Sequence, residues 1–293
     1  MAQKVVLVTG SSEGGIGYAL CEEFAARNCI VYASARRLSA LANLPASVHR
    51  VELDVLSAAS CKAAVDHVIA KQGRIDVLVN NAGAGGTGAL LDADVESDEG
   101  AKATFEVNVW APLRLSKIVA PHMVNQKSGL IVNVGSIVGN VPTPWSGVYS
   151  ASKAALHALT EVLRMETKGL GIEIMLVAPG AIRSQFGKKQ LATFKLPDDS
   201  LYKDVADEIA KRAEISQRQD HTTPAAVLAR GVVSRALRSR PPAYYTVGGK
   251  SWVFWMLERI PRTWVWAILG RALGTWKVGK AKAGQAAGSK RTD

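Results

Sequence analysis

The sequence predicts an α/β protein in which helices cover both faces of a doubly wound parallel sheet. First, short apolar runs alternate along the chain with longer amphipathic stretches, which is typical of strand–helix units. Second, the runs are almost continuous in Val, Ile and Leu, as strands buried on both faces require. Third, a glycine-rich turn follows the first run directly, where such a sheet places a ligand.

The predicted elements follow one another at regular intervals. Strands are predicted at 4–10, 29–34, 48–55, 75–83, 129–136 and 172–180. Helices are predicted at 17–27, 58–71, 101–124 and 151–168, with a further helix at about 224–238 and a strand at 243–249. We therefore expect a single domain over 1–250, followed by a Trp-rich amphipathic C-terminal extension.

The stretch 185–222 interrupts this alternation, because it has few strong apolar periods. A long connection at the ligand edge of a sheet is typical of a substrate lid. Arg183, Lys188 and Lys189 stand at its start, where they either hold a substrate phosphate or remain solvated.

Bulk composition narrows the possible functions. The chain of 293 residues is 48% hydrophobic and 21% charged, which suits a large folded domain and excludes a disordered protein. Its formal net charge of +11 predicts an acidic partner such as nucleotide phosphates or an anionic membrane surface. No nucleic-acid-binding motif organises the basic residues, so we expect no nucleic-acid partner.

Cysteine and histidine usage indicates neither a disulfide framework nor a metal site. Cys21, Cys29 and Cys61 lack metal or redox spacing, which favours reduced residues in a reducing compartment. The five histidines form no His-x-x-x-His pair, so no metal is expected. The first residues do not resemble a signal peptide, and no window reaches the ~18 apolar residues of a membrane-spanning helix. These features predict a protein that starts in the cytosol.

The glycine-rich turn predicts a dinucleotide site. In "VLVTGSSEGGIGYAL" (6–20) the turn joins a strand to a helix, so the backbone can approach a pyrophosphate at the helix N-terminus. At the end of the second strand, where an NAD site places Asp or Glu, the sequence has Arg36 and Arg37. A guanidinium binds a 2′-phosphate through paired hydrogen bonds, so the predicted cofactor is NADP(H).

Tyr149 and Lys153 stand four residues apart at the start of a helix, so their side chains share one face. An ammonium beside a phenol favours the phenolate and lowers the pKa of the tyrosine toward neutrality. A tyrosine tuned in this way acts as a general acid or base at physiological pH. A solvated surface pair is the alternative for these two residues taken alone.

Several short motifs together resemble the short-chain dehydrogenase/reductase family over roughly residues 4–250. They are the glycine loop 9–17, "NNAG" (80–83), "VNVW" around Asn108, "NVGS" ending at Ser136, "YSASK" (149–153) and "APG" (178–180). The loop "TGSSEGGIG" departs from the family pattern by one additional residue, which leaves its phosphate contacts open.

The resemblance implies a Rossmann fold and an NADP(H)-dependent oxidoreductase that acts on CH–OH groups. Tyr149 would donate a proton to a carbonyl oxygen, and Lys153 would lower its pKa and hold the nicotinamide ribose. Ser136 would hydrogen-bond the carbonyl, and Asn108 would position a water in a proton relay. The implied cofactor-binding residues are Gly10, Ser11, Ser12, Gly15, Ile16, Gly17, Arg36, Arg37, Asp54, Val55, Asn81, Ala82, Gly83, Tyr149, Lys153, Pro179, Gly180, Ile182 and Ser184.

A closer resemblance is to the branch of NADPH-dependent 1-acyldihydroxyacetone-phosphate reductases. It is carried by "GGIG", "VYASARR", "VNVW", "PTPWSGVYSASKAAL", "LPDDSLY" and the aromatic tail. It implies reduction of a 1-acyl- or alkyl-dihydroxyacetone phosphate to the glycerol 3-phosphate lipid. A steroid, retinoid or other lipid-ketone dehydrogenase is the alternative. A non-catalytic lipid-surface protein is a third hypothesis, which the presence of all four implied catalytic residues disfavours.

The segment 251–276 holds five of the seven tryptophans. Pro261 is expected to break it into two short helices. Their Trp-rich faces, together with neighbouring arginines and the basic tail 277–293, which is predicted to be disordered, suit a membrane interface. We therefore expect peripheral binding to the cytosolic face of the endoplasmic reticulum or of lipid droplets. Alternatively the aromatic residues cover the cleft of a cytoplasmic protein or form a dimer contact. The family resemblance also implies a homodimer through the helices near 101–124 and 151–168.

Overall fold

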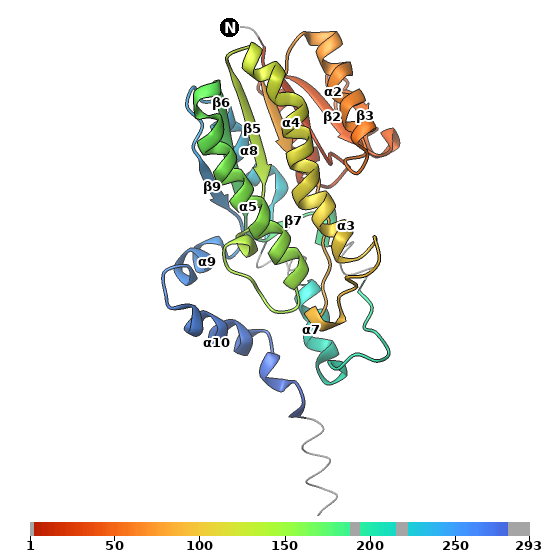
Figure 1. The fold of residues 1–293 in the computed structure, drawn as a ribbon, viewed down its shortest axis with the longest axis vertical. Coiled ribbons are helices and arrows are strands. Elements are labelled where there is room, and N and C mark those ends of the chain that lie inside the picture. Colours follow the sequence, from red (N-terminus) through yellow and green to blue (C-terminus); the bar gives the residue numbers. More distant parts are fainter. Residues whose placement is uncertain (1–2, 188–193, 215–221, 281–293) are drawn as a thin grey trace, which may run out of the picture.

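Parallel strands form the centre of the molecule (Figure 1) in a computed structural model that describes residues 3–187, 194–214 and 222–280. They are β1 (Val5–Val8), β2 (Ile30–Ala35), β3 (His49–Glu52), β4 (Val77–Asn80), β5 (Gly129–Val134), β6 (Ile172–Pro179) and β9 (Tyr244–Val247). Their order in the sheet is β3-β2-β1-β4-β5-β6-β9, with every neighbouring pair parallel. The predicted doubly wound fold is confirmed, and the strand order reverses between β1 and β4.

Helices cover both faces of this sheet. The flanking helices are α1 (Ile16–Ala26), α2 (Ala58–Gln72), α4 (Ala111–Asn125), α5 (Gly147–Thr167) and α8 (Ala225–Ala236). Val6 and Val8 of β1 face the core under α1 and α8, whereas Val5 and Leu7 face the core under α2 and α4. Burial on both faces explains why the strand sequences are continuously apolar.

Smaller elements gather beyond the carboxyl ends of the strands. They are β7 (Ile182–Arg183) paired with β8 (Thr223–Pro224), and the helices α7 (Ala206–Glu214), α9 (Ser251–Leu257) and α10 (Arg262–Ala272). In Figure 1 the three helices lie below the sheet, at the end away from the chain's N-terminus. They therefore enclose the edge where a doubly wound sheet binds ligands.

The helix predicted at 101–124 is interrupted in the structure. It begins as α3 (Ala101–Phe105), continues as a π-helical turn (Glu106–Trp110) and resumes as α4. Pro112 explains the change, because it lacks the N–H that would bond the carbonyl of Asn108 in an α-helix. Wider turns of this kind are frequent at functional sites.

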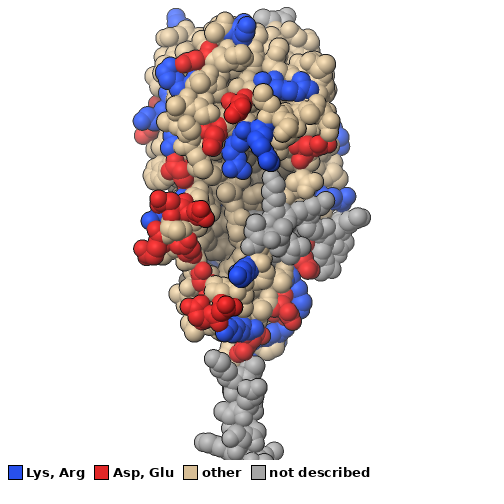
Figure 2. All heavy atoms as spheres, turned by 90° about the vertical axis from the view of Figure 1, so that its right-hand side faces the viewer, with Lys and Arg blue, Asp and Glu red and all other residues tan. Residues whose placement is uncertain are grey.

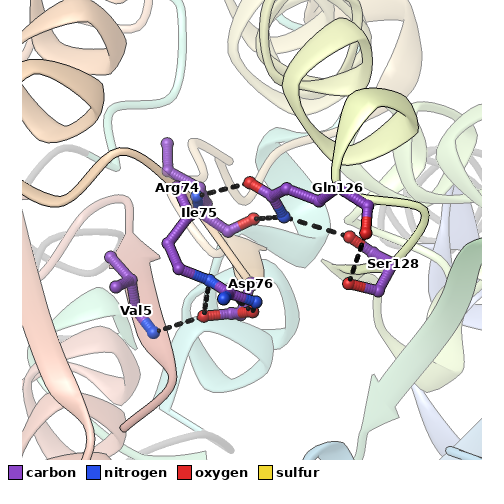
Figure 3. Close-up of polar contacts among 6 residues, drawn as sticks. All are labelled: Val5, Arg74, Ile75, Asp76, Gln126 and Ser128. Carbon is purple, nitrogen blue, oxygen red and sulfur yellow. Dashed lines mark hydrogen bonds and ion pairs between the residues drawn. The ribbon is translucent and has the colours of Figure 1, made fainter. Parts of the chain in front are cut away.

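A closed set of polar contacts joins the strands at their amino ends (Figure 3). The buried carboxylate of Asp76 accepts a 2.8 Å hydrogen bond from the N–H of Val5 and pairs with the guanidinium of Arg74. The amide of Gln126 bonds both the N–H and the carbonyl of Ile75, at 3.2 and 3.1 Å. These contacts fix β1, β4 and the end of α4 relative to one another.

The C-terminal extension forms two short helices, as predicted, with Pro261 immediately before α10. Leu257 and Val265 are buried against Val141 of the main domain. The indole N–H of Trp145 donates a 2.7 Å hydrogen bond to the carbonyl of Leu273 just after α10. The extension is therefore packed onto the domain. Of the helices that the structure describes, none has the length and apolar character to cross a bilayer.

The three cysteines are free and buried. No cluster of His, Cys, Asp and Glu among the described residues could hold a metal ion. Most of the predicted basic tail, from residue 281 onward, lies outside the described residues.

Candidate active site

A cleft of about 720 Å³ runs across the carboxyl ends of the strands. One end is lined by the glycine loop, Arg36 and Asp54, and the other by Tyr149, Arg212 and the helices α9 and α10. A hollow with few charged side chains is visible on the side face in Figure 2, with Lys and Arg side chains directly above it. The cleft lies at the point where the strand order reverses, as expected for this fold.

Two glycines of the loop between β1 and α1 are required by close packing. Gly10 has φ +67°, and a Cβ there would lie 2.7 Å from the Cα of Ala82. A Cβ at Gly17 would lie 2.5 Å from the side-chain nitrogen of Asn81. These contacts hold the loop against the end of β4, so larger side chains would displace it.

Backbone N–H groups of the glycine loop remain available to a ligand. The N–H groups of Ser11, Glu13 and Gly15 donate to the carbonyls of neighbouring loops or of the loop itself. Within the described part of the chain, the N–H groups of Ser12 and Ile16 donate to no protein acceptor. Ser12 and Ile16 also line the cleft at the N-terminus of α1. The loop therefore presents free N–H donors, including those of Ser12 and Ile16, and a helix N-terminus to an anion.

Ser11 and Gly17 do not line the cleft, although the resemblance assigns both to cofactor binding. The hydroxyl of Ser11 is buried, donates to the carbonyl of Val8 at 3.1 Å and accepts from the thiol of Cys21 at 3.4 Å. These two residues support the shape of the loop, since their side-chain positions are occupied by protein contacts.

The two predicted phosphate-binding arginines differ in position. Arg36 lines the cleft together with Asp54 and Val55, whereas Arg37 does not. The carboxylate of Asp54 accepts from the N–H of Leu56 at 3.1 Å, so it is engaged in its own turn. Arg36 is therefore the guanidinium available to a 2′-phosphate at this end.

Most of the other residues predicted to bind the cofactor lie along the wall between the two ends. Asn81 holds the glycine loop, because its side-chain nitrogen donates to the carbonyls of Thr9 and Gly10 at 2.9 and 3.0 Å. The predicted residues along this wall are Asn81, Ala82, Gly83, Pro179, Gly180, Ile182 and Ser184.

Tyr149, Lys153 and Ser136 converge on the middle of the cleft. The first two come from one face of α5, and Ser136 follows the end of β5. The Lys153 Nζ lies 5.7 Å from the centre of the Tyr149 ring and donates a 2.8 Å hydrogen bond to the carbonyl of Val134. The structure thus brings together three of the four residues implied to be catalytic.

The predicted decrease in the Tyr149 pKa is wrong in this structure. Burial raises the pKa of Tyr149 to about 12, and this exceeds the lowering by its hydrogen bond with Ser136 and by the charge of Arg212. Burial also lowers the pKa of Lys153 to about 8. Removal of the phenol and the ammonium from water therefore outweighs their proximity, because burial disfavours the charged form of each group.

Asn108, the fourth residue, lies behind the cleft wall in the π-helical turn. Its side chain donates to the carbonyl of Ala84 at 2.7 Å and to the hydroxyl of Ser152 at 2.9 Å, and it accepts from the N–H of Ala84 at 2.9 Å. It is fully buried and connects α5 to the loop after β4. The described contacts of Asn108 are all to protein groups.

Sequence reasoning missed a hydrogen-bond chain that starts behind Ser136. The N–H of Ser136 donates to His157 Nε2 at 3.3 Å, and His157 Nδ1 bonds the side-chain oxygen of Asn140 at 2.8 Å. The side-chain nitrogen of Asn140 donates to Tyr244 of β9 and to Glu258 after α9, both at 2.8 Å. Because Nε2 accepts, the imidazole is neutral, and burial lowers the pKa of His157 to about 4. The spacing of Ser136, Asn140 and His157 in the sequence gives no signal for this chain.

Of the basic residues proposed to hold a substrate phosphate, the structure describes only Arg183, and it is not brought to the cleft. Arg183 is exposed, does not line the cleft and donates to the hydroxyl of Thr222 at 3.5 Å. Lys188 and Lys189 lie outside the described residues. Sequence reasoning instead missed Arg212 of α7, which does line the cleft.

The geometry fits a dinucleotide. Gly10 permits the backbone to approach a pyrophosphate, the N–H groups of Ser12 and Ile16 are available to it, and Arg36 stands at the ribose position. The nicotinamide end would then reach Tyr149 and Lys153 across the cleft.

Comparison with known proteins decides the family. Residues 4–194 match the family model for short chain dehydrogenases, which is more than half of the chain. The chain belongs to the short-chain dehydrogenase family. As a member of this family it is an NAD(P)-dependent oxidoreductase.

Two sequence relatives and one solved structure illustrate the similarity of this short-chain dehydrogenase to known proteins. Short-chain dehydrogenase ptmH of Penicillium ochrochloron is 36% identical over 266 residues, which cover 89% of this chain and 95% of the relative. The NADPH-dependent 1-acyldihydroxyacetone phosphate reductase of Schizosaccharomyces pombe is 34% identical over 207 residues, which cover 69% of this chain and 68% of the relative. The crystal structure of a short-chain dehydrogenase from Streptomyces avermitilis matches with a TM-score of 0.75 at 28% identity, covering 97% of this chain and 98% of that one.

Proposed function

We propose that this short-chain dehydrogenase is an NADP(H)-dependent reductase of lipophilic ketones. The observation that carries the proposal is the position of Tyr149 in the cleft. Tyr149 lies between an end built for a nucleotide and a chamber whose walls include Val253, Phe254, Leu257 and Leu269 of the C-terminal helices. An apolar chamber beside a general acid suits a ketone with a long hydrocarbon group.

The protein's own residues would handle the proton and the orientation of the substrate. Tyr149 is protonated at physiological pH, because its pKa is raised to about 12, so it can donate its proton to the carbonyl oxygen. Ser136 would donate a second hydrogen bond to the same oxygen. The ammonium of Lys153 would stabilise the tyrosinate that remains. The cofactor supplies the hydride when bound.

Two observations favour NADP(H) over NAD(H). Arg36 lines the cleft at the position of the adenosine ribose, where a guanidinium suits a 2′-phosphate. The fission yeast relative is named as an NADPH-dependent enzyme.

The leading substrate is a 1-acyl- or alkyl-dihydroxyacetone phosphate, which would be reduced to the corresponding glycerol 3-phosphate lipid. The name of the fission yeast relative supports this choice. Relatives of higher identity, such as the Penicillium protein, carry the general name short-chain dehydrogenase. A steroid, retinoid or other lipid ketone is therefore the second candidate.

The outer surface of the C-terminal helices supports binding to a lipid surface. Their inner residues line the cleft, whereas Trp252, Trp255, Trp264 and Trp266 are more than half exposed. Exposed tryptophans with nearby arginines and lysines suit the interface of a membrane, so we place the protein at the cytosolic face of the endoplasmic reticulum or of lipid droplets. From the sequence alone, a cover for the cleft and a membrane-binding surface are alternatives for this segment. Opposite sides of the same helices can provide both.

A homodimer through α4 and α5 is a further part of the proposal. Val162 and Met165 of α5 are exposed, as is Trp110 directly before α4. A second copy that covers these side chains would remove apolar surface from water.

The test is reduction of 1-hexadecyl-dihydroxyacetone phosphate by the purified protein, followed through the loss of NADPH absorbance. A steroid ketone and NADH serve as the competing substrate and cofactor. Faster turnover of the phosphate ester with NADPH supports the proposal, whereas faster turnover of the steroid ketone would replace the substrate. NADPH binding without reduction of any ketone would favour a non-catalytic lipid-surface protein.

A further inference from the structure

Arg212 is a cation at the substrate end of the cleft. It comes from the last turn of α7 and lines the cleft with Tyr149 and with Leu273 of the C-terminal extension. Its guanidinium donates a 3.2 Å hydrogen bond to the buried hydroxyl of Thr143. Among the described residues no carboxylate pairs with it.

Burial of the Arg212 charge without an opposite charge beside it costs free energy. Burial lowers the pKa of Arg212. Arg212 and Tyr149 also interact electrostatically, so the two side chains lie near one another in the cleft. An arginine has five N–H donors, of which the described contacts of Arg212 use one. A charge withdrawn from water is normally paired with an opposite charge, and none of the residues that the structure describes supplies one here.

The other cationic side chains of the cleft differ from Arg212 in position, hydrogen-bond partner or exposure. Arg36 lines the nucleotide end of the cleft, as does Asp54. Lys153 donates to the carbonyl of Val134. Lys250, directly before α9, is exposed. Arg212 is therefore the partly buried guanidinium that faces the apolar chamber at the substrate end.

We infer that Arg212 forms a subsite for an acidic group of the substrate, a carboxylate or a phosphate ester, separate from the carbonyl that Tyr149 protonates. The inference rests on the proposed function, because it defines the class of ketone that the chamber accepts. A guanidinium binds either group through two parallel hydrogen bonds. The accepted substrate is then an amphipathic ketone, with its acid at Arg212 and its hydrocarbon against α9 and α10.

The first experiment compares three matched long-chain ketones that end in a phosphate, a carboxylate or a neutral methyl ester. With Arg212→Gln we expect KM for the acidic ketones to rise by about 10- to 100-fold, the range for loss of a charged hydrogen bond, with kcat changed much less. KM for the methyl ester should stay within about two-fold of the wild-type value, because the neutral ester makes no ion pair. Arg212→Lys should recover part of the loss, since it keeps the charge without the two-pronged geometry.

The matched control is Arg230→Gln, which removes the same charge from an exposed position on α8. It should leave all three KM values at their wild-type levels. An equal rise in KM for acidic and neutral ketones with Arg212→Gln would show that Arg212 is structural and would overturn the inference. Wild-type preference for the methyl ester would overturn it as well.

A binding measurement separates failure of the inference from failure of the proposed function. Dodecyl phosphate, dodecanoate and dodecanol are titrated into the NADPH-bound protein while the fluorescence of the bound nicotinamide is followed. Arg212-dependent binding of either anion, without reduction of any ketone, would keep the subsite and reject the reductase. Turnover of ketones, with anion binding that Arg212→Gln does not change, would keep the reductase and reject the subsite. Comparison of the two anions identifies which acidic group the subsite prefers.

Discussion

The two ends of the central sheet differ in whether their polar groups have partners within the protein. At the amino ends, Asp76, Arg74 and Gln126 satisfy one another and the adjacent backbone (Figure 3). At the carboxyl ends, Arg36 and Arg212 have no carboxylate partner among the described residues, and backbone N–H groups of the glycine loop point to no protein acceptor. A polar group that is satisfied internally contributes to stability, whereas one left open in a cleft is available to a ligand.

The largest expected effect comes from the carboxyl end. Tyr149→Phe removes the proton donor but keeps the ring, so kcat should fall by about 10³-fold or more while NADPH affinity changes little. Single-turnover kinetics and a cofactor titration would measure the two quantities. Tyr18→Phe, at a partly exposed tyrosine of α1, is the control and should retain full activity. A Tyr149→Phe variant with near wild-type kcat would assign the proton to another group.

His157 sharpens the comparison, because it is a carboxyl-end group that the protein satisfies itself. Its pKa is about 6.5 when unfolded and falls to about 4 in the folded protein. As the pH falls, the unfolded state therefore binds a proton at His157 before the folded state does. The contribution of His157 to the stability of the folded state is complete above pH ~6.5 and is lost toward pH ~4. The free energy of unfolding should decrease by about 3 kcal/mol across this range from His157 alone.

Urea denaturation at several pH values would test this contribution. A His157→Gln variant should show a flatter dependence between pH ~6.5 and ~4, because Gln does not titrate. Equal pH dependence of the variant and the wild type would mean that other groups control acid stability.

At the amino end, Asp76→Asn should affect stability and leave catalysis intact. The variant loses the ion pair with Arg74 and weakens the hydrogen bond from Val5, which should cost about 1–3 kcal/mol of unfolding free energy. Denaturation would measure the loss, and kcat of the folded variant should equal that of the wild type. A large decrease in kcat would contradict the separation between the two ends.

The smallest expected effect concerns cofactor choice. Arg36→Gln should weaken NADPH binding by about 10-fold, the value of one charged hydrogen bond, and leave NADH binding nearly unchanged. Arg37→Gln should weaken NADPH binding less, because Arg37 does not line the cleft. Fluorescence titrations with both nucleotides would measure the affinities. The opposite ranking of the two variants would move the phosphate site to Arg37.

The sequence could predict the fold and the location of the site because both depend on local patterns. Continuous apolar runs such as the one at 4–10 became strands, and the residues after them were placed at one edge by the parallel topology. The break at Pro261 also followed from chemistry that any chain obeys. Tyr149 and Lys153 were found through helical spacing and the family motif.

The remaining features depend on contacts between distant segments. Arg212 lies in a stretch without a motif, and only the packing of α7 brings it to Tyr149. The direction of the Tyr149 pKa shift depends on burial, which the spacing of two residues does not reveal. Pro112, which explains the π-helical turn, is visible locally, but the contacts of Asn108 in that turn with Ala84 are not.

The hydrogen-bond chain from the backbone N–H of Ser136 through His157 and Asn140 to Glu258 connects the C-terminal extension to the proposed active site. A chain truncated after residue 250 would lose the Glu258 acceptor and, with α9 and α10, a wall of the cleft. Such a deletion would therefore alter the surroundings of Ser136, the proposed carbonyl-binding residue, together with the shape of the proposed substrate chamber. Exchange of the extension between relatives would change the surroundings of Ser136 and the substrate chamber together. Each new extension would have to supply a hydrogen-bond acceptor to Asn140.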